Sequence, residues 1–204
     1  TGLPVNADFE SGYANDLEEL AANVRRCVET GVAGLSIEDA TGDAAQPLFD
    51  RAVAIERFRA ARKAVSDTNT GVLLTARSEC FLTGHPEPLR EAIERLTAFA
   101  AEGADVLYAP GVSKPDDIRA IVRAVSPKPV NFLMSRSLGL SVADLAEMGV
   151  RRVSVGSALS RAAWTGFINA AREIAERGTF GAFDGMVPFA EINGLFRTDY
   201  RSDK

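Results

Sequence analysis

Two carboxylates, Asp8 and Glu38, each stand where a short apolar run of the sequence ends. A carboxylate among apolar neighbours is costly unless it is paired or bound to a metal. No basic residue lies next to either one in the sequence, and carboxylate oxygens are ligands that Mg²⁺ and Mn²⁺ prefer. The pair therefore indicates a Mg²⁺ or Mn²⁺ site. The alternative is that Asp8 caps a loop and Glu38 pairs with an arginine from another strand.

Arg77 ends a third apolar run, and a guanidinium can hold a carboxylate or a phosphonate through two parallel hydrogen bonds. The alternative is an ion pair with Glu38 or Glu79. Both roles can hold together, because an acid can orient an arginine that binds substrate. Asn131 lies inside a fourth apolar run, where its amide must find partners. It either orients substrate or ties adjacent strands together.

These residues are carried by a repeated pattern of a short apolar run, a polar loop and an amphipathic helix. Six runs predict strands, at residues 3–8, 32–37, 71–76, 104–108, 129–134 and 151–155. Strict alternation with helices predicts a parallel α/β sheet, and continuous apolar strands indicate that both faces are covered. We expect a capping box at Asn15 and Glu18, a short helix capped by Ser141 and Asp144 that ends at Gly149, and a long helix that ends at Gly178.

The polar residues gather at the carboxyl ends of several strands, which is typical of the catalytic face of a (β/α)8 barrel. An open nucleotide-binding sheet would carry a glycine-rich turn after its first strand, and the turn after Asp8 has no such motif. A closed barrel needs eight strands. We therefore predict a TIM-type barrel, with two strand–helix units that precede Thr1.

Composition restricts the partners of this chain. Its 204 residues are 46% hydrophobic and 25% charged, with a net charge of −5, which suits one globular core. Basic residues are scattered and the apolar runs are short, so neither nucleic acid nor a membrane is an expected partner. Cys27 and Cys80 are too few for a disulfide framework, so we expect a cytoplasmic protein. The expected partner is a small-molecule substrate.

Six short motifs in consistent order resemble those of the isocitrate lyase / phosphoenolpyruvate mutase superfamily. Residues 5–13 (VNADFESGY) resemble its D-A-D-x-G-Y-G region, residues 35–39 (LSIED) its I-E-D motif, and residues 75–79 (TARSE) its A-R-T-D or A-R-x-E strand. The other three motifs lie at residues 104–111, 129–131 and 153–156. The likeness extends to about Phe196.

The resemblance implies that the chain begins at the family's third strand. Residues 1–178 would then hold barrel strands three to eight, and residues 179–204 a C-terminal extension with a short helix near residues 188–196. It also implies Mg²⁺ held by Asp8 and Glu38, largely through water, and Arg77 bound to the acidic group of the substrate. The same resemblance implies a homo-oligomer, either a dimer or a tetramer of dimers that exchange a C-terminal helix.

Two departures from the family pattern matter. Asn6 replaces the first aspartate of D-A-D, and Glu10 is a further, compensating candidate for the metal shell. The loop at residues 40–50, which would form the lid, lacks both the K-x-C-G-H of the carbon–carbon lyases and the lysine-threonine-asparagine of the phosphonate mutases. Its only ionisable residues are Asp43 and Asp50.

We therefore expect a Mg²⁺-dependent carbon–carbon lyase or decarboxylase, acting through a pyruvate enolate on a small 2-oxo or 2-hydroxy diacid like oxaloacetate or malate. Asp8, Glu38 and Arg77 would be its catalytic residues, and Asn131 would help Arg77 bind substrate. One alternative is a phosphonopyruvate hydrolase or phosphoenolpyruvate mutase, which uses the same enolate. Another is a barrel that binds a ligand without catalysis, which Asn6 and the altered lid allow.

Overall fold

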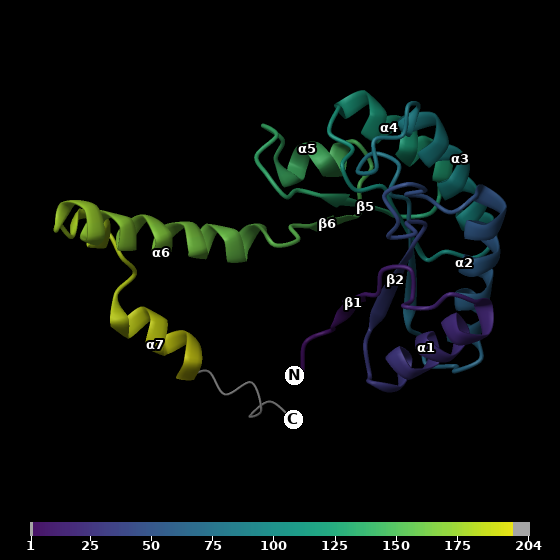
Figure 1. Cartoon of the computed structure of the whole chain (residues 1–204), viewed down its shortest axis with the longest axis horizontal. Helices are drawn as coiled ribbons and strands as arrows, with labels where there is room; N and C mark the ends of the chain where they lie inside the picture. Colours follow the sequence, from purple (N-terminus) through teal and green to yellow (C-terminus); the bar gives the residue numbers. More distant parts are fainter. Residues whose placement is uncertain (1, 198–204) are drawn as a thin grey trace. The chain divides into compact units, whose positions relative to one another are not determined.

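The computed structural model describes residues 2–197, which divide into two compact units (Figure 1). One unit is Pro4–Ser154, and the other contains the chain from Val155 onwards. The candidate site lies wholly within the first unit. The predicted division between a barrel that ends at residue 178 and an extension after it stays a prediction.

The Pro4–Ser154 unit is a half-barrel of six parallel strands in sequence order, which confirms the predicted α/β alternation. The strands are β1 (Asn6–Asp8), β2 (Gly34–Glu38), β3 (Leu73–Arg77), β4 (Val106–Tyr108), β5 (Val130–Leu133) and β6 (Arg152–Ser154). The helices between them are α1 (Leu17–Glu29), α2 (Arg51–Ser66), α3 (Pro88–Ala101), α4 (Pro115–Val125) and α5 (Val142–Glu147). Closure of the barrel with two further strands stays a prediction.

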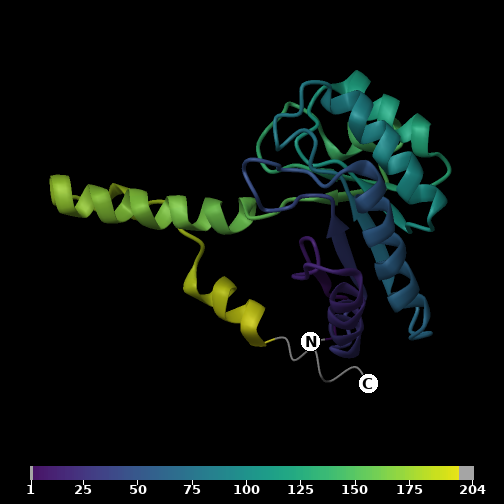
Figure 2. The same cartoon turned by 45° about the vertical axis from the view of Figure 1, so that its right-hand side comes forward.

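The helices lie along the outer side of the curved sheet, and the strands lie inside the arc (Figures 1 and 2). Successive residues of a strand point to opposite faces. One alternate set of strand residues joins the buried core with the helices: Leu35, Ile37, Leu74, Ala76, Leu107, Val130 and Phe132. The other set, which includes Glu38 and Arg77, therefore faces the inside of the arc.

Helix ends follow local chemistry. The predicted cap of Ser141 and Asp144 is confirmed at the start of α5, where the two residues form a capping box. The predicted box of Asn15 and Glu18 is wrong by one residue, because the side chain of Asp16 accepts from the backbone N–H of Glu19 at 2.8 Å.

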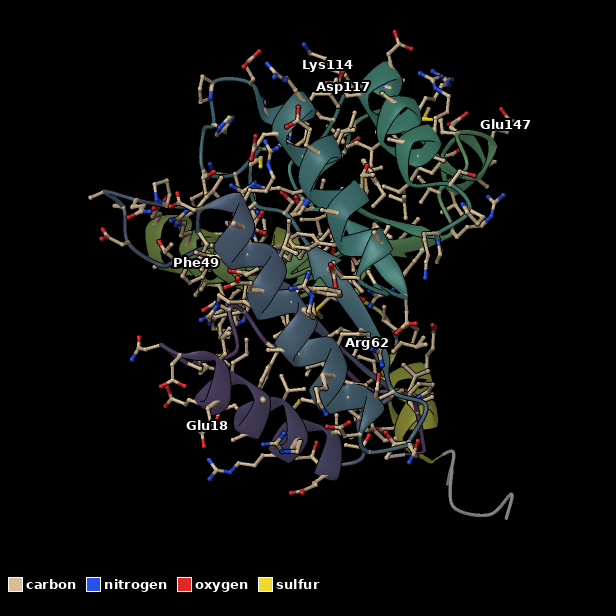
Figure 3. All side chains as sticks on the ribbon, turned by 90° about the vertical axis from the view of Figure 1, so that its right-hand side faces the viewer. Glu18, Phe49, Arg62, Lys114, Asp117 and Glu147 are labelled. Atoms are coloured by element: carbon tan, nitrogen blue, oxygen red, sulfur yellow. The ribbon has the colours of Figure 1, made fainter. Side chains whose placement is uncertain are left out.

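Arg57 of α2, which is 4% exposed, contacts both the β1–α1 loop and the β2–α2 loop at the carboxyl edge of the sheet. Its guanidinium donates to the carbonyls of Ser11 and Ala14 in the β1–α1 loop, both at 2.8 Å. The same guanidinium lies 4.5 Å from the ring centroid of Phe49, the residue at which the β2–α2 loop approaches α2 (Figure 3). One buried cation thus fixes both loops.

The β2–α2 loop, predicted as a lid, is folded on itself. Ala40 and Leu48 form an isolated antiparallel bridge, and the N–H of Thr41 donates to the carbonyl of Pro47 at 3.0 Å. The Asp43 carboxylate accepts from the N–H of Ala45 at 2.8 Å, so it caps this turn.

The second unit holds α6 (Ala158–Arg177), a 3₁₀ turn (Gly181–Phe183) and α7 (Phe189–Arg197). Gly178 ends α6 in the left-handed conformation, as expected, and α7 confirms the predicted short helix. No α6 residue is buried, and its Trp164 and Phe167 are exposed. No helix within residues 2–197 combines the length and apolar character that crossing a membrane requires.

Gly12 has a positive φ of 87°, and a Cβ placed there would lie 2.1 Å from Cδ1 of the buried Leu20. Gly31 has a similar φ of 84° with open space around it. Both Gly→Ala changes should cost about 1–2 kcal/mol for the left-handed backbone, and Gly12→Ala about 1–3 kcal/mol more from overpacking. Urea unfolding of the two variants measures the difference. Equal losses would contradict the close packing of this loop.

Candidate active site

Arg77, at the end of β3, meets three carboxylates at the carboxyl edge of the sheet. Its Nη1 lies 3.1 Å from an oxygen of Asp8, its Nε lies 3.3 Å from an oxygen of Glu38, and the same Nε donates to Glu79. Glu38 and Arg77 are register partners on β2 and β3, so their side chains share one face. The structure therefore brings together the predicted Asp8, Glu38 and Arg77, and Arg77 pairs with both Glu38 and Glu79.

These contacts differ in how well water screens them. The side chains of Arg77, Glu38 and Glu79 are 17%, 14% and 8% exposed, whereas that of Asp8 is 70% exposed. Contacts with exposed carboxylates are weak. Asp8 is therefore the partner that Arg77 can most easily give up.

Acid is in excess around this single cation. Burial raises the pKa of Glu38 to about 7; Arg77 opposes the shift, while the charges of Glu79, Asp8 and Glu10 add to it. Burial also raises the pKa of Glu79, again against the effect of Arg77. Burial alone would lower the pKa of Arg77, but the hydrogen bond and the charges of its acidic neighbours raise it. The cluster thus has a deficit of positive charge that a divalent cation would correct.

Asp39 supports the cluster through contacts with Glu79 and Arg95. Its buried carboxylate accepts from the N–H of Glu79 at 2.8 Å and from Nη1 of Arg95 at 3.3 Å. Arg95 also donates to the carbonyl of Phe49 at 2.9 Å, and the N–H of Phe49 donates to the carbonyl of Asp39. Asp39 and Arg95 therefore fix Glu79 and the end of the lid loop together. The sequence gives Asp39 as part of an I-E-D motif but does not reveal this role.

Glu10 contributes mainly through its backbone. It has a positive φ of 46°, and its carbonyl accepts from the N–H of Glu38 at 2.9 Å. Its charge contributes to the raised pKa of Glu38, so the carboxylate lies near enough to act on the cluster. Asn6 starts β1 rather than ending it, and it lines a cavity of about 240 Å³ with Thr75 and Arg152.

Sequence reasoning missed Tyr108, which continues the polar row. The register pairs Arg77 with Tyr108 and Tyr108 with Asn131, so all three face the same side of the sheet. Cζ of Arg77 lies 5.3 Å from the ring centroid of Tyr108, a cation–π distance. Its position in the sequence could have indicated this role, since Tyr108 is the last residue of β4 as Arg77 is the last residue of β3.

Asn131 is 2% exposed, and its side-chain amide is hydrogen bonded at the nitrogen but not at the oxygen. Its Nδ2 donates to Oγ of Ser154 on the neighbouring β6 at 2.9 Å, which is the strand-tying role. Its Oδ1 is buried and has no hydrogen-bond partner among residues 2–197. A buried acceptor without a donor is costly, which suits a group that meets a donor from a ligand.

The donor set suits a hard cation that binds partly through water. Within residues 2–197 no group of three or more histidine, cysteine, aspartate or glutamate side chains is arranged to enclose a metal. Asp8 and Glu38 nevertheless present carboxylate oxygens beside an excess of negative charge, and Mg²⁺ usually keeps several waters and one or two carboxylates. The residues present therefore fit Mg²⁺ or Mn²⁺.

The lone histidine lies outside the acid cluster. Nδ1 of His85 accepts from the N–H of Glu87 at 3.2 Å, and the ring lines a cavity of about 310 Å³ with Phe49 and Arg95.

Comparison with known proteins identifies the class to which this fold and site belong. The phosphoenolpyruvate phosphomutase family model matches residues 1–175. A crystal structure from Burkholderia cenocepacia J2315, of a protein assigned to the lyase/mutase class, has a TM-score of 0.91 and 44% identity; the match covers 97% of this chain and 71% of that one. The chain belongs to the phosphoenolpyruvate mutase / isocitrate lyase superfamily.

One further relative and one solved structure extend the comparison. The oxaloacetate decarboxylase of Rhodopseudomonas palustris strain CGA009 is 34% identical over a 162-residue alignment, and the match covers 75% of this chain and 51% of that protein. The chain thus spans about half the length of that relative. A phosphonopyruvate hydrolase solved with oxalate and Mg²⁺ shares the fold, with a TM-score of 0.78 and 24% identity over 96% of this chain and 69% of that one.

Glu38 gives a test of the acid excess. Its pKa is raised from 4.5 to about 7, so the folded state keeps a proton that the unfolded state releases. The free energy of unfolding should therefore fall as pH rises from about 4.5 to about 7. In metal-free protein, Glu38→Gln should be more stable than wild type by about 1–3 kcal/mol at pH 8, and the difference should vanish at pH 4.

Urea unfolding at pH 4, 6 and 8 in the presence of a chelator measures this difference. The matched control is Glu147→Gln, which neutralises an exposed acid at the end of α5 (Figure 3). A wild type more stable than Glu38→Gln at pH 8 would show that Arg77 fully compensates the cluster, and would contradict the acid excess.

Proposed function

We propose that this protein is a Mg²⁺-dependent lyase of the decarboxylase kind, acting on a small 2-oxo diacid like oxaloacetate through a pyruvate enolate. The observation that carries the proposal is one arginine among an excess of acids at the carboxyl edge of a family half-barrel. The likeness to an oxaloacetate decarboxylase supports the choice of substrate class.

Asp8 and Glu38 would hold the metal, partly through water. When bound, Mg²⁺ would stabilise the negative charge that develops on the substrate oxygen. Arg77 would bind a substrate carboxylate through a paired hydrogen bond. To present two donors, it would release the exposed Asp8 from Nη1 and keep the buried Glu79 on Nε. The exposed Asp8 carboxylate, once released by Arg77, would be one of the residues that hold the metal.

The lid favours decarboxylation over retro-aldol cleavage of a larger 2-hydroxy acid. Retro-aldol cleavage leaves an enolate-type product that needs a proton, and the family's lyases supply it from a lid cysteine. The only ionisable lid residues here are Asp43 and Asp50, which are normally deprotonated at pH 7. Asp43, moreover, already accepts a backbone hydrogen bond. Loss of CO₂ does not depend on a lid acid, because the enolate that remains can take its proton afterwards from another source.

The second candidate is phosphorus–carbon chemistry, as in a phosphonopyruvate hydrolase or phosphoenolpyruvate mutase. The description of the matching family model favours it, and Arg77 would serve a phosphonate equally well. We also propose a homo-oligomer in which the exposed apolar face of α6 packs against another copy. A cytoplasmic location stays a prediction.

A substrate panel separates these functions. Purified protein with Mg²⁺ is given oxaloacetate, malate, isocitrate, methylisocitrate and phosphonopyruvate, and CO₂, pyruvate, glyoxylate and phosphate are measured separately. We expect CO₂ and pyruvate from oxaloacetate and little cleavage of isocitrate or methylisocitrate. Activity should disappear with a chelator.

Arg77→Lys serves as the matched variant in the same panel. The ammonium of lysine cannot form the two parallel hydrogen bonds that the planar guanidinium of arginine forms. The value of kcat/KM should therefore fall by roughly 100-fold while the protein stays folded. Phosphate release from phosphonopyruvate would support the second candidate instead. A folded protein inactive on every substrate would point to a ligand-binding barrel without catalysis.

A further inference from the structure

The pyruvate enolate of the proposed reaction must receive a proton at carbon, and the charged groups of the cluster are poor sources. Arg77 stays protonated in proteins. Asp8 and Glu79 are its ion-pair partners, and Glu38 is a candidate metal ligand. A neutral side chain that faces the same side of the sheet is therefore a better candidate for the donor.

Tyr108 is such a group. It is 8% exposed and ends β4 in the same register row as Glu38 and Arg77. A phenol titrates near pH 10, so it is far more acidic than a serine or threonine hydroxyl. Burial raises the pKa of Tyr108 while the charge of Arg77 and a hydrogen bond to Ser154 oppose the shift, so the phenol stays protonated at neutral pH.

The surroundings of Tyr108 fix its ring and would stabilise its anion. The Arg77 guanidinium lies against the ring, with Cζ 5.3 Å from the centroid. Ser154 lowers the pKa of the phenol, as Arg77 does, and the Ser154 hydroxyl accepts from Nδ2 of Asn131 at 2.9 Å. Tyr108, Asn131 and Ser154 lie on the three adjacent strands β4, β5 and β6, so paired strands rather than loops set the position of the phenol.

We propose that Tyr108 is a further catalytic residue, the proton donor to C3 of the enolate, with Ser154 and Asn131 as positioning residues. This inference rests on the proposed function. After CO₂ has left, the enolate carbon takes the phenol proton: a C–H bond forms at C3, the O–H bond of Tyr108 breaks, and pyruvate results. The phenolate, beside Arg77, then regains a proton from water.

The same step run backwards gives a sharp test, because Tyr108 must also help to remove a methyl proton of pyruvate. Wild type with Mg²⁺ and pyruvate in D₂O should exchange the methyl protons, as followed by ¹H NMR. Tyr108→Phe removes only the hydroxyl, and exchange should fall by about 100-fold or more. CO₂ release from oxaloacetate should change far less, because that bond breaks before the proton is needed.

Tyr13→Phe tests the other described phenol near the acid cluster: Tyr13 is 58% exposed in the β1–α1 loop, and desolvation and the charge of Glu10 raise its pKa. It should exchange within a few-fold of wild type. If Tyr108→Phe unfolds, Ser154→Ala tests the same chain with the ring intact, and it should lower exchange more than CO₂ release. Circular dichroism and urea unfolding establish that each variant is folded.

Exchange at the wild-type rate in folded Tyr108→Phe would overturn the inference while the proposed function stands. Equal losses of exchange and CO₂ release would also overturn it, because Tyr108 would then act before the enolate forms. Loss of exchange in Tyr13→Phe or His85→Gln instead would assign the donor elsewhere. A wild type that neither releases CO₂ nor exchanges pyruvate overturns both proposals together.

Discussion

The ion pairing of Arg77 with Glu38 and Glu79 is the interaction on which the rest of this site depends. Two largely buried carboxylates share one guanidinium, and an exposed third, Asp8, competes for it. Because the charges do not balance, the pKa of Glu38 is raised to about 7 even with a cation 3.3 Å away. An arrangement that is poor for stability in the free protein is suited to recruiting a divalent cation, whose charge would in turn favour an acidic substrate.

The scaffold produces this arrangement through strand register rather than loop contacts. Parallel strands in register place Glu38, Arg77, Tyr108 and Asn131 in one row on the inner face, while their neighbours in sequence pack against the helices. The loops above the row are then fixed by buried arginines from α2 and α3. Function is thus assigned to the inner face and stability to the outer face of the same short strands.

Sequence reasoning found the residues whose type is unusual for their place and missed those whose type is ordinary there. Asp8, Glu38 and Arg77 are charged residues at the ends of apolar runs, which is a strong signal. Tyr108 resembles a core residue in an apolar strand, and only the register shows that it faces the polar row. The capping box of α1 was placed one residue early because Asn15–Glu18 and Asp16–Glu19 both fit the pattern, and a hydrogen bond decides between them.

The central claim is that the acid excess around Arg77 is completed by a divalent cation. Titration of Mn²⁺ followed by electron paramagnetic resonance, with Mg²⁺ as competitor, tests it directly and needs no substrate. The account predicts one Mn²⁺ per chain that Mg²⁺ displaces, with affinity lowered about 10- to 100-fold in Asp8→Asn and unchanged in Glu18→Gln, which alters an exposed acid on α1 (Figure 3). Absence of binding, or equal binding by all three proteins, would contradict it.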